Sequence, residues 1–205
     1  MAWPLLAMLA AACGQTSDGQ GSGAETGSGP ANGMATVAKT FEGPKPEGVS
    51  GPNEAFTRTY YIPAAANSDM YEIEAGKLAM ERASRPEVKA FAQRMITDHE
   101  KTAKALRGFV ESNPVNIAVP SHMDARRRAM IDNLESSSAQ EFDRAYIGQQ
   151  AAAHQEALNL HKSYASRGDD KKLAKVAQNT VAIVEHHAKA VTDLERAFGA
   201  GHDTR

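Results

Sequence analysis

Cysteine is almost absent from this sequence, with one in 205 residues, so an internal disulfide framework is excluded. Aromatic residues are also scarce, at 6%. The 23 lysines and arginines nearly balance the 25 aspartates and glutamates, and the net charge of −2 gives no basic field for phosphate groups. A glycine-rich phosphate loop is missing too. These shortages argue against nucleic acid as a partner.

The one cysteine, Cys13, ends the apolar run "MAWPLLAMLAAAC", which is too short to span a bilayer. The run has the apolar character and small-residue ending of an export signal, although no lysine or arginine precedes Cys13. "LAAAC" before Gly14 resembles a bacterial lipobox, with Ala10 where leucine is usual. Residues 1–13 are therefore interpreted as a signal or lipobox-like segment, and Cys13 as the site of lipidation. Plain secretion and an unprocessed cysteine are the alternatives.

Residues 14–53 are rich in glycine, serine, proline and threonine and poor in apolar residues. Such a composition cannot bury enough surface to offset the cost of ordering the chain. We expect a flexible tether that separates an anchor at Cys13 from a domain spanning residues 54–205. The expected localisation is the periplasm, or the outer membrane as a lipoprotein.

The domain is expected to be all-α, because helix-forming residues dominate and no stretch alternates with period two. Breaks at prolines and glycines predict helices at about 62–84, from Pro86 to before Ser112, 121–136, 139–166, and from the Asp169-Asp170 pair to about Gly199. The third helix would run about 24 Å. The first two and the last two helices each form a hairpin, and the third helix lies in the long crossover connection between the hairpins. This order predicts a ferritin-like four-helix bundle.

The two hairpins share an Ala-Ser-Arg turn, at 83–85 and 165–167, with similar apolar spacing after it. Duplication is left open, because short alanine-rich helices match easily. Superposing the two turns places Glu72 opposite His154.

Three stretches carry a resemblance to a known family: "NSDMYEIEAGKLAMERASRPEVKAFAQRMITDHEKT", "FDRAYIGQQAAAHQEALNLHKSYA" and "LAKVAQNTVAIVEHH". The matching motifs are Glu72 through Gly76-Lys77-Leu78, Asp98-His99, Tyr146, Gln150 with His154, and Thr180 with His187. Over residues 62–198 the chain resembles the domain of unknown function 4142 family, which comprises exported bacterial ferritin-like proteins. Val181-Ala182 stand where that family usually has Leu-Pro. The resemblance implies a fold and a compartment, and no activity.

Four polar residues fall on or beside the apolar stripes of four different helices: Glu72, His99, His154 and His187. Counting residues from the connecting turns places Glu72, His99 and His154 at similar positions along the bundle axis and His187 about one helical turn away. The sequence has no Glu-x-x-His, so a standard di-iron oxidase site is not expected. His161 shares the face of His154, whereas His186 is expected to face solvent.

Two interpretations of these residues remain open. They either form a hydrogen-bond network that fixes helix pairing, or they bind a transition metal such as Zn, Cu, Ni or Fe. We therefore expect a binding or structural role in the cell envelope, with a metal-binding redox or storage protein as the alternative. Catalysis is the less favoured role, because the domain has no thiol and no recognisable nucleophile. A homo-oligomer is left open, since alanine-rich helix surfaces pack readily against copies.

Lipidation at Cys13 predicts a change of location. Cys13→Ser should move the protein from the membrane fraction to the soluble fraction, because the acceptor thiol is lost. Fractionation with immunoblotting measures this. An unchanged distribution, with the N-terminal run still attached, would contradict the export interpretation.

Overall fold

The computed structural model describes residues 56–200 and contains five helices. Their bounds are α1 Arg58–Arg82, α2 Pro86–Ser112, α3 Ala125–Ser136, α4 Phe142–Arg167 and α5 Lys171–Ala200. No strand occurs in this range. The all-α fold class is thus confirmed. The predicted segments 1–13 and 14–53 lie outside the described residues. Within residues 56–200, every helix is too short or too polar to cross a membrane.

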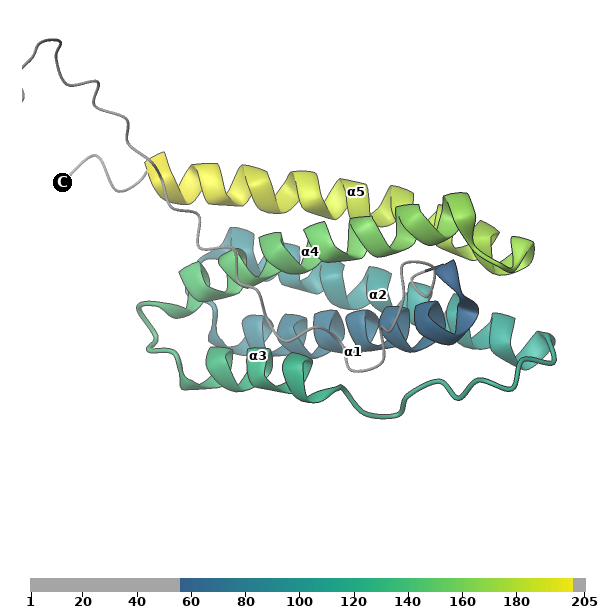
Figure 1. The fold of residues 1–205 in the computed structure, drawn as a ribbon. Coiled ribbons are helices and arrows are strands. Elements are labelled where there is room, and N and C mark those ends of the chain that lie inside the picture. Colours follow the sequence, from purple (N-terminus) through teal and green to yellow (C-terminus); the bar gives the residue numbers. More distant parts are fainter. Residues whose placement is uncertain (1–55, 201–205) are drawn as a thin grey trace, which may run out of the picture. The chain divides into compact units, whose positions relative to one another are not determined.

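The helices form two antiparallel hairpins, α1–α2 and α4–α5, that pack together as a four-helix bundle (Figure 1). A long connection leads from α2 back to α4 and contains α3, which packs against α1 and α4. This connection is the crossover expected from the sequence. It lets α4 run antiparallel to α1, so that residues from all four long helices can meet at one height.

Helix α1 begins four residues earlier than predicted. Thr57 caps it, since the Thr57 hydroxyl accepts a hydrogen bond from the Tyr60 amide at 3.3 Å. Pro63 therefore lies inside the helix and not at its start. The first turn is held by tertiary contacts: the Arg58 amide donates to Asp169 at 2.9 Å, and the Tyr61 ring stacks on Tyr164. Such contacts outweigh the weak helix propensity of this segment.

Helix α3 begins at Ala125, later than the predicted residue 121, because Asp124 and not Ser121 is its cap. The Asp124 carboxylate accepts from the Arg127 amide at 2.7 Å. The far end of α3 is held by the Arg82 guanidinium, which donates to the carbonyls of Leu134, Glu135 and Ser137. One α1 side chain thus satisfies three carbonyls at the end of the crossover helix.

Helix α4 starts at Phe142, three residues after the predicted start, and ends at a glycine cap, as expected. Gly168 has φ −56° and ψ 143°, so it does not adopt the left-handed conformation usual for such caps. It is needed for space: a Cβ would lie 2.6 Å from the Tyr164 carbonyl oxygen and 2.7 Å from its ring. At the start of α5, Asp170 caps the amides of Lys172 and Leu173.

The apolar core consists of two clusters. One includes Tyr71, Ala75, Met95, Phe142 and Tyr146 and lies toward the α1–α2 turn. The other lies toward the α4–α5 turn and includes these residues: Tyr61, Ile62, Leu106, Phe109, Tyr164 and Leu173. Between the two clusters lies a layer of buried polar side chains, which includes Glu72, His99, His154 and His187.

Gly76 marks the closest approach of α1 and α2. A Cβ there would lie 2.8 Å from Ile96 Cγ1 and 3.1 Å from the Ala92 carbonyl oxygen, whereas a Cβ at Gly148 in α4 would meet nothing within 4 Å. Gly76→Ala should lower the free energy of unfolding by about 1–3 kcal/mol, since the helices must separate. Gly148→Ala should raise it by about 0.5–1 kcal/mol through helix propensity. Urea denaturation measures both; equal effects of the two substitutions would contradict the close packing at Gly76.

His161 generates a prediction about acid stability. Its Nδ1 lies 2.9 Å from the Tyr61 hydroxyl, and burial lowers the pKa of His161 from 6.5 to about 4, against the opposing effect of Asp69. The unfolded chain therefore binds a proton at a pH where the folded chain does not. The contribution of neutral His161 to the free energy of unfolding is complete above pH 6.5 and is lost as the pH falls through 4. The loss is limited to about 3 kcal/mol.

His161→Gln can still pair with Tyr61 but does not titrate, so its free energy of unfolding should fall less steeply between pH 6.5 and 4 than that of the wild type. Urea denaturation at a series of pH values measures the two slopes. Identical slopes would show that His161 is not kept neutral by the fold.

Candidate metal centre

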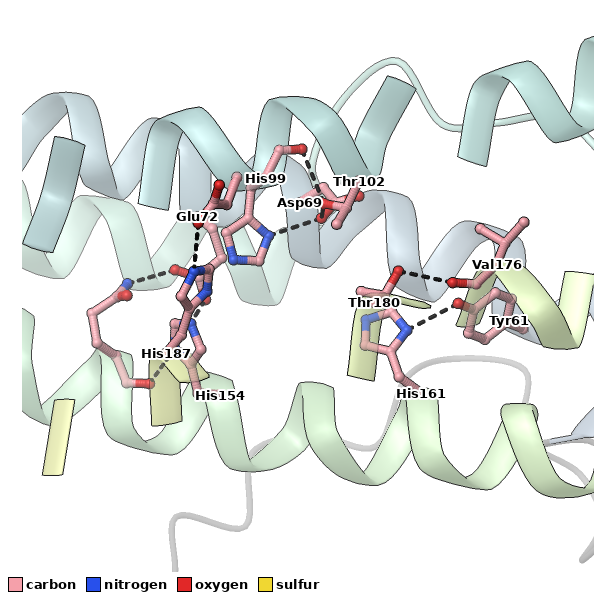
Figure 2. A network of polar contacts seen from close by, with 12 residues as sticks. Tyr61, Asp69, Glu72, His99, Thr102, His154, His161, Val176, Thr180 and His187 are labelled. Atoms are coloured by element: carbon pink, nitrogen blue, oxygen red, sulfur yellow. Dashed lines mark hydrogen bonds and ion pairs between the residues drawn. The ribbon is translucent and has the colours of Figure 1, made fainter. Parts of the chain in front are cut away.

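The four polar residues singled out in the sequence lie together in the buried layer between the two apolar clusters. Glu72, His99 and His154 are each 1% exposed, and His187 is 0% exposed. Figure 2 shows the three histidines and Glu72 converging from α1, α2, α4 and α5. The ring centroids are 5.9 Å apart for His99–His154 and 5.4 Å apart for each pair that includes His187. The three imidazoles thus form a nearly equilateral triangle.

The expected displacement of His187 by one turn is wrong. The residues between Arg167 and Lys171 form the connection and do not advance along the bundle axis. In addition, helical side chains lean toward the N-terminus of their helix. In an antiparallel pair this moves His154 away from the turn and His187 toward it, so the two imidazoles meet.

Each imidazole has one ring nitrogen held by an oxygen acceptor. His154 Nδ1 lies 2.8 Å from the Gln150 carbonyl oxygen, His99 Nδ1 lies 2.9 Å from Asp69, and His187 Nε2 lies 3.0 Å from Asp98. Carbonyl and carboxylate oxygens only accept, so these nitrogens carry the hydrogen. In the neutral imidazoles the opposite nitrogens then present lone pairs.

The opposite nitrogens have no hydrogen-bond partner in the protein, although they are buried: His99 Nε2, His154 Nε2 and His187 Nδ1. One ring nitrogen from each histidine lies within 4.8 Å of the others. Nitrogens bound to one metal at 2.0–2.1 Å are about 3.3–3.6 Å apart, so a movement of about 1 Å would bring the three onto one ion. Leaving such groups unpaired costs about 1–3 kcal/mol each.

Glu72 lies beside the triangle and is oriented by Gln150. The Gln150 amide donates to Glu72 Oε2 at 2.7 Å, while Oε1 has no partner and lies 3.9 Å from His154 Nδ1. Glu72 and His154, which the superposed turns placed opposite each other, thus lie close together in the layer. Gln150 Oε1 and the hydroxyls of Ser68 and Tyr146 are also buried and unpaired within the protein.

The three imidazoles differ in their proton affinity. Burial lowers the pKa of His154, and burial lowers the pKa of His187 to about 3, with His99 and His154 adding to the effect and Asp98 opposing it. Both are neutral at neutral pH and can offer a lone pair. Burial also disfavours the charged form of His99, but Asp69, Glu72 and Asp98 outweigh it and raise its pKa. A metal at His99 competes with this proton.

Two carboxylates of the layer were not assigned a role from the sequence. Asp69 precedes Glu72 by three residues on α1 and accepts from both His99 and the Thr102 hydroxyl, the latter at 2.7 Å. Asp98 is adjacent to His99 and points about 100° away from it, which carries it to His187 on α5. The signal available for Asp69 was its spacing from Glu72, since residues three apart share a helix face.

The fold resembles that of three solved structures that are described as forms of CopM. "CopM in the Cu(II)-bound form" has a TM-score of 0.58 at 20% identity and covers 69% of this chain and 97% of its own. The Ag-bound form has a TM-score of 0.57 at 21% identity and covers 69% of this chain and 96% of its own. The Cu(I)-bound form has a TM-score of 0.56 at 21% identity and covers 69% of this chain and 97% of its own. At this identity the similarity establishes a shared fold.

No curated protein matches the sequence. A family model matches residues 45–194, a range that includes Glu72 and the three histidines of the triangle. The chain therefore belongs to the family described as domain of unknown function (DUF4142).

Proposed function

We propose that this chain is a copper-binding protein of the bacterial cell envelope that holds the ion between His99, His154 and His187. The proposal is supported by the state of the three rings: each has one buried nitrogen without a hydrogen-bond partner, while its opposite nitrogen is held by an oxygen. One ring nitrogen from each histidine lies within 4.8 Å of the others. This arrangement is typical of metal-binding histidines, whose outer nitrogen donates to a carboxylate or carbonyl group. It pre-orients the rings before an ion arrives.

A hydrogen-bond network alone accounts less well for the layer. Two of the imidazoles do link helices, as that interpretation requires: His99 on α2 bonds Asp69 on α1, and His187 on α5 bonds Asp98 on α2. His154 bonds the Gln150 carbonyl oxygen of its own helix. However, a network that only fixed helix pairing would satisfy its buried nitrogens, because each unpaired one lowers stability. A bound ion pairs all three at once.

The donor set favours copper or zinc. Imidazole nitrogen suits Zn, Cu, Fe and Ni, and among divalent ions Cu²⁺ binds such sites most tightly. Copper is the first choice because the structurally similar CopM has been described in Cu(II)-bound and Cu(I)-bound forms. A site of three imidazoles without a thiolate is also compatible with Zn²⁺.

The carboxylates around the triangle would balance the charge of the ion. Asp69 and Asp98 contact the outer nitrogens of His99 and His187, and Glu72 has a free oxygen beside His154. We assign to Glu72 the role of fourth ligand, which it can fill after a shift toward the ion. Three carboxylates close to one buried position favour a cation there and disfavour an anion.

The envelope location rests on the lipobox-like sequence that ends at Cys13. A lipid anchor at Cys13 followed by a long polar tether would place the bundle at a membrane surface, free to meet ions in the surrounding compartment. A storage or buffering role suits such a placement, and it requires no catalytic group.

The metal site predicts stabilisation by copper. At free Cu²⁺ one hundred times above Kd, the free energy of unfolding should rise by about 2.7 kcal/mol, measured as a higher Tm. His99→Gln and His154→Gln, which retain much of the side-chain volume, should abolish the shift. His186→Gln is the matched control: His186 is exposed and adjacent to His187, so this variant should respond like the wild type.

Titration against a chromophoric chelator gives the affinity of each variant, and electron paramagnetic resonance of the Cu²⁺ complex reports the imidazole nitrogens. If the Tm of the wild type does not change with Cu²⁺ or Zn²⁺, or if His186→Gln loses the shift as His99→Gln does, the proposed site is wrong.

A further inference from the structure

One group in the layer connects the buried triangle with the surface. Three groups hold the outer nitrogens of the imidazoles, and two of them are buried: the Asp69 side chain is 6% exposed and Gln150 is 0% exposed. The third is Asp98, whose side chain is 24% exposed, although the His187 side chain that it contacts is 0% exposed. Asp98 therefore touches a candidate ligand on one side and water on the other.

His187 stands between this carboxylate and the interior. Its Nε2 lies 3.0 Å from Asp98 Oδ2, and its Nδ1 is buried without a partner. The two nitrogens of one ring thus face the surface carboxylate and the interior of the layer. A movement of the His187 ring that breaks its bond to Asp98 would connect this partly exposed carboxylate with the buried layer that contains His99 and His154.

A cation already occupies the outer oxygen of this carboxylate. Lys101 Nζ lies 2.9 Å from Asp98 Oδ1, and the Lys101 side chain is 66% exposed. An exposed ammonium is readily displaced, because such surface ion pairs are worth at most about 1 kcal/mol. Asp98 can therefore exchange this ammonium for a metal ion without unfolding any helix.

We infer that Asp98 is the entry point of the site: it captures the metal ion from solvent, and His187 then swings to pass the ion inward and closes as a ligand. This inference rests on the proposed function and adds a route to it, along the seam between α2 and α5. Capture by a partly exposed carboxylate speeds association through electrostatic attraction, and the affinity itself is set by the three imidazoles.

The association rate tests the route. Asp98→Asn keeps an oxygen that accepts from His187 but removes the negative charge, so the association rate constant for Cu²⁺ should fall roughly ten-fold. Lys101→Gln removes the competing ammonium and should raise the association rate constant for Cu²⁺. Glu185→Gln is the matched control, since it removes one negative charge from an exposed α5 residue that pairs with Lys162, and its association rate should match the wild type.

Stopped-flow quenching of tyrosine fluorescence by Cu²⁺, on the full chain, gives these rates, and circular dichroism verifies folding. If Asp98→Asn does not fold, Lys101→Gln carries the test alone, and an unchanged or lower rate overturns the route. If Asp98→Asn folds and binds as fast as the wild type, or if Glu185→Gln slows equally, the route is wrong and the three-histidine site stands. A wild type that binds no Cu²⁺ overturns the site itself.

Discussion

A buried imidazole nitrogen needs a hydrogen bond or a metal ion, and the described part of the bundle contains three such nitrogens without a hydrogen-bond partner in the protein. The rest of the layer is arranged around them. Asp69, Asp98 and the Gln150 carbonyl hold the outer nitrogens, which fixes the direction of the inner ones. The apolar clusters lie on either side of the layer, and the three inner nitrogens are buried away from bulk solvent.

Helix geometry explains how so few residues build this layer. On α1, Asp69 and Glu72 share a face but lie beside different histidines, Asp69 beside His99 and Glu72 beside His154. On α2, the neighbours Asp98 and His99 diverge by about 100°, so one enters the triangle while the other supports His187 from the outside. The crossover through α3 matters here too, because it sets α4 antiparallel to α1 and brings His154 level with Glu72.

The sequence predicted the helical class, the crossover and the four inward residues, because apolar periodicity and breaks at proline and glycine are local signals. It did not predict the start of α1, where contacts of Arg58 and Tyr61 with distant residues outweigh propensity. Nor did it predict the height of His187, which depends on how the α4–α5 turn is built and on the lean of the side chains. Asp98 was recognised as adjacent to His99, but its partner on α5 could be found only from the packing of the two hairpins.

The proposed site requires that His99, His154 and His187 bind one metal ion. Its most direct test is a crystal structure of the copper-loaded chain, with the ion located by anomalous diffraction at the copper edge. One strong peak is expected inside the bundle, about 2.0–2.2 Å from a ring nitrogen of each of the three histidines. A peak only at an exposed histidine such as His186, with the three inner nitrogens paired to one another or to water, would contradict a three-histidine site.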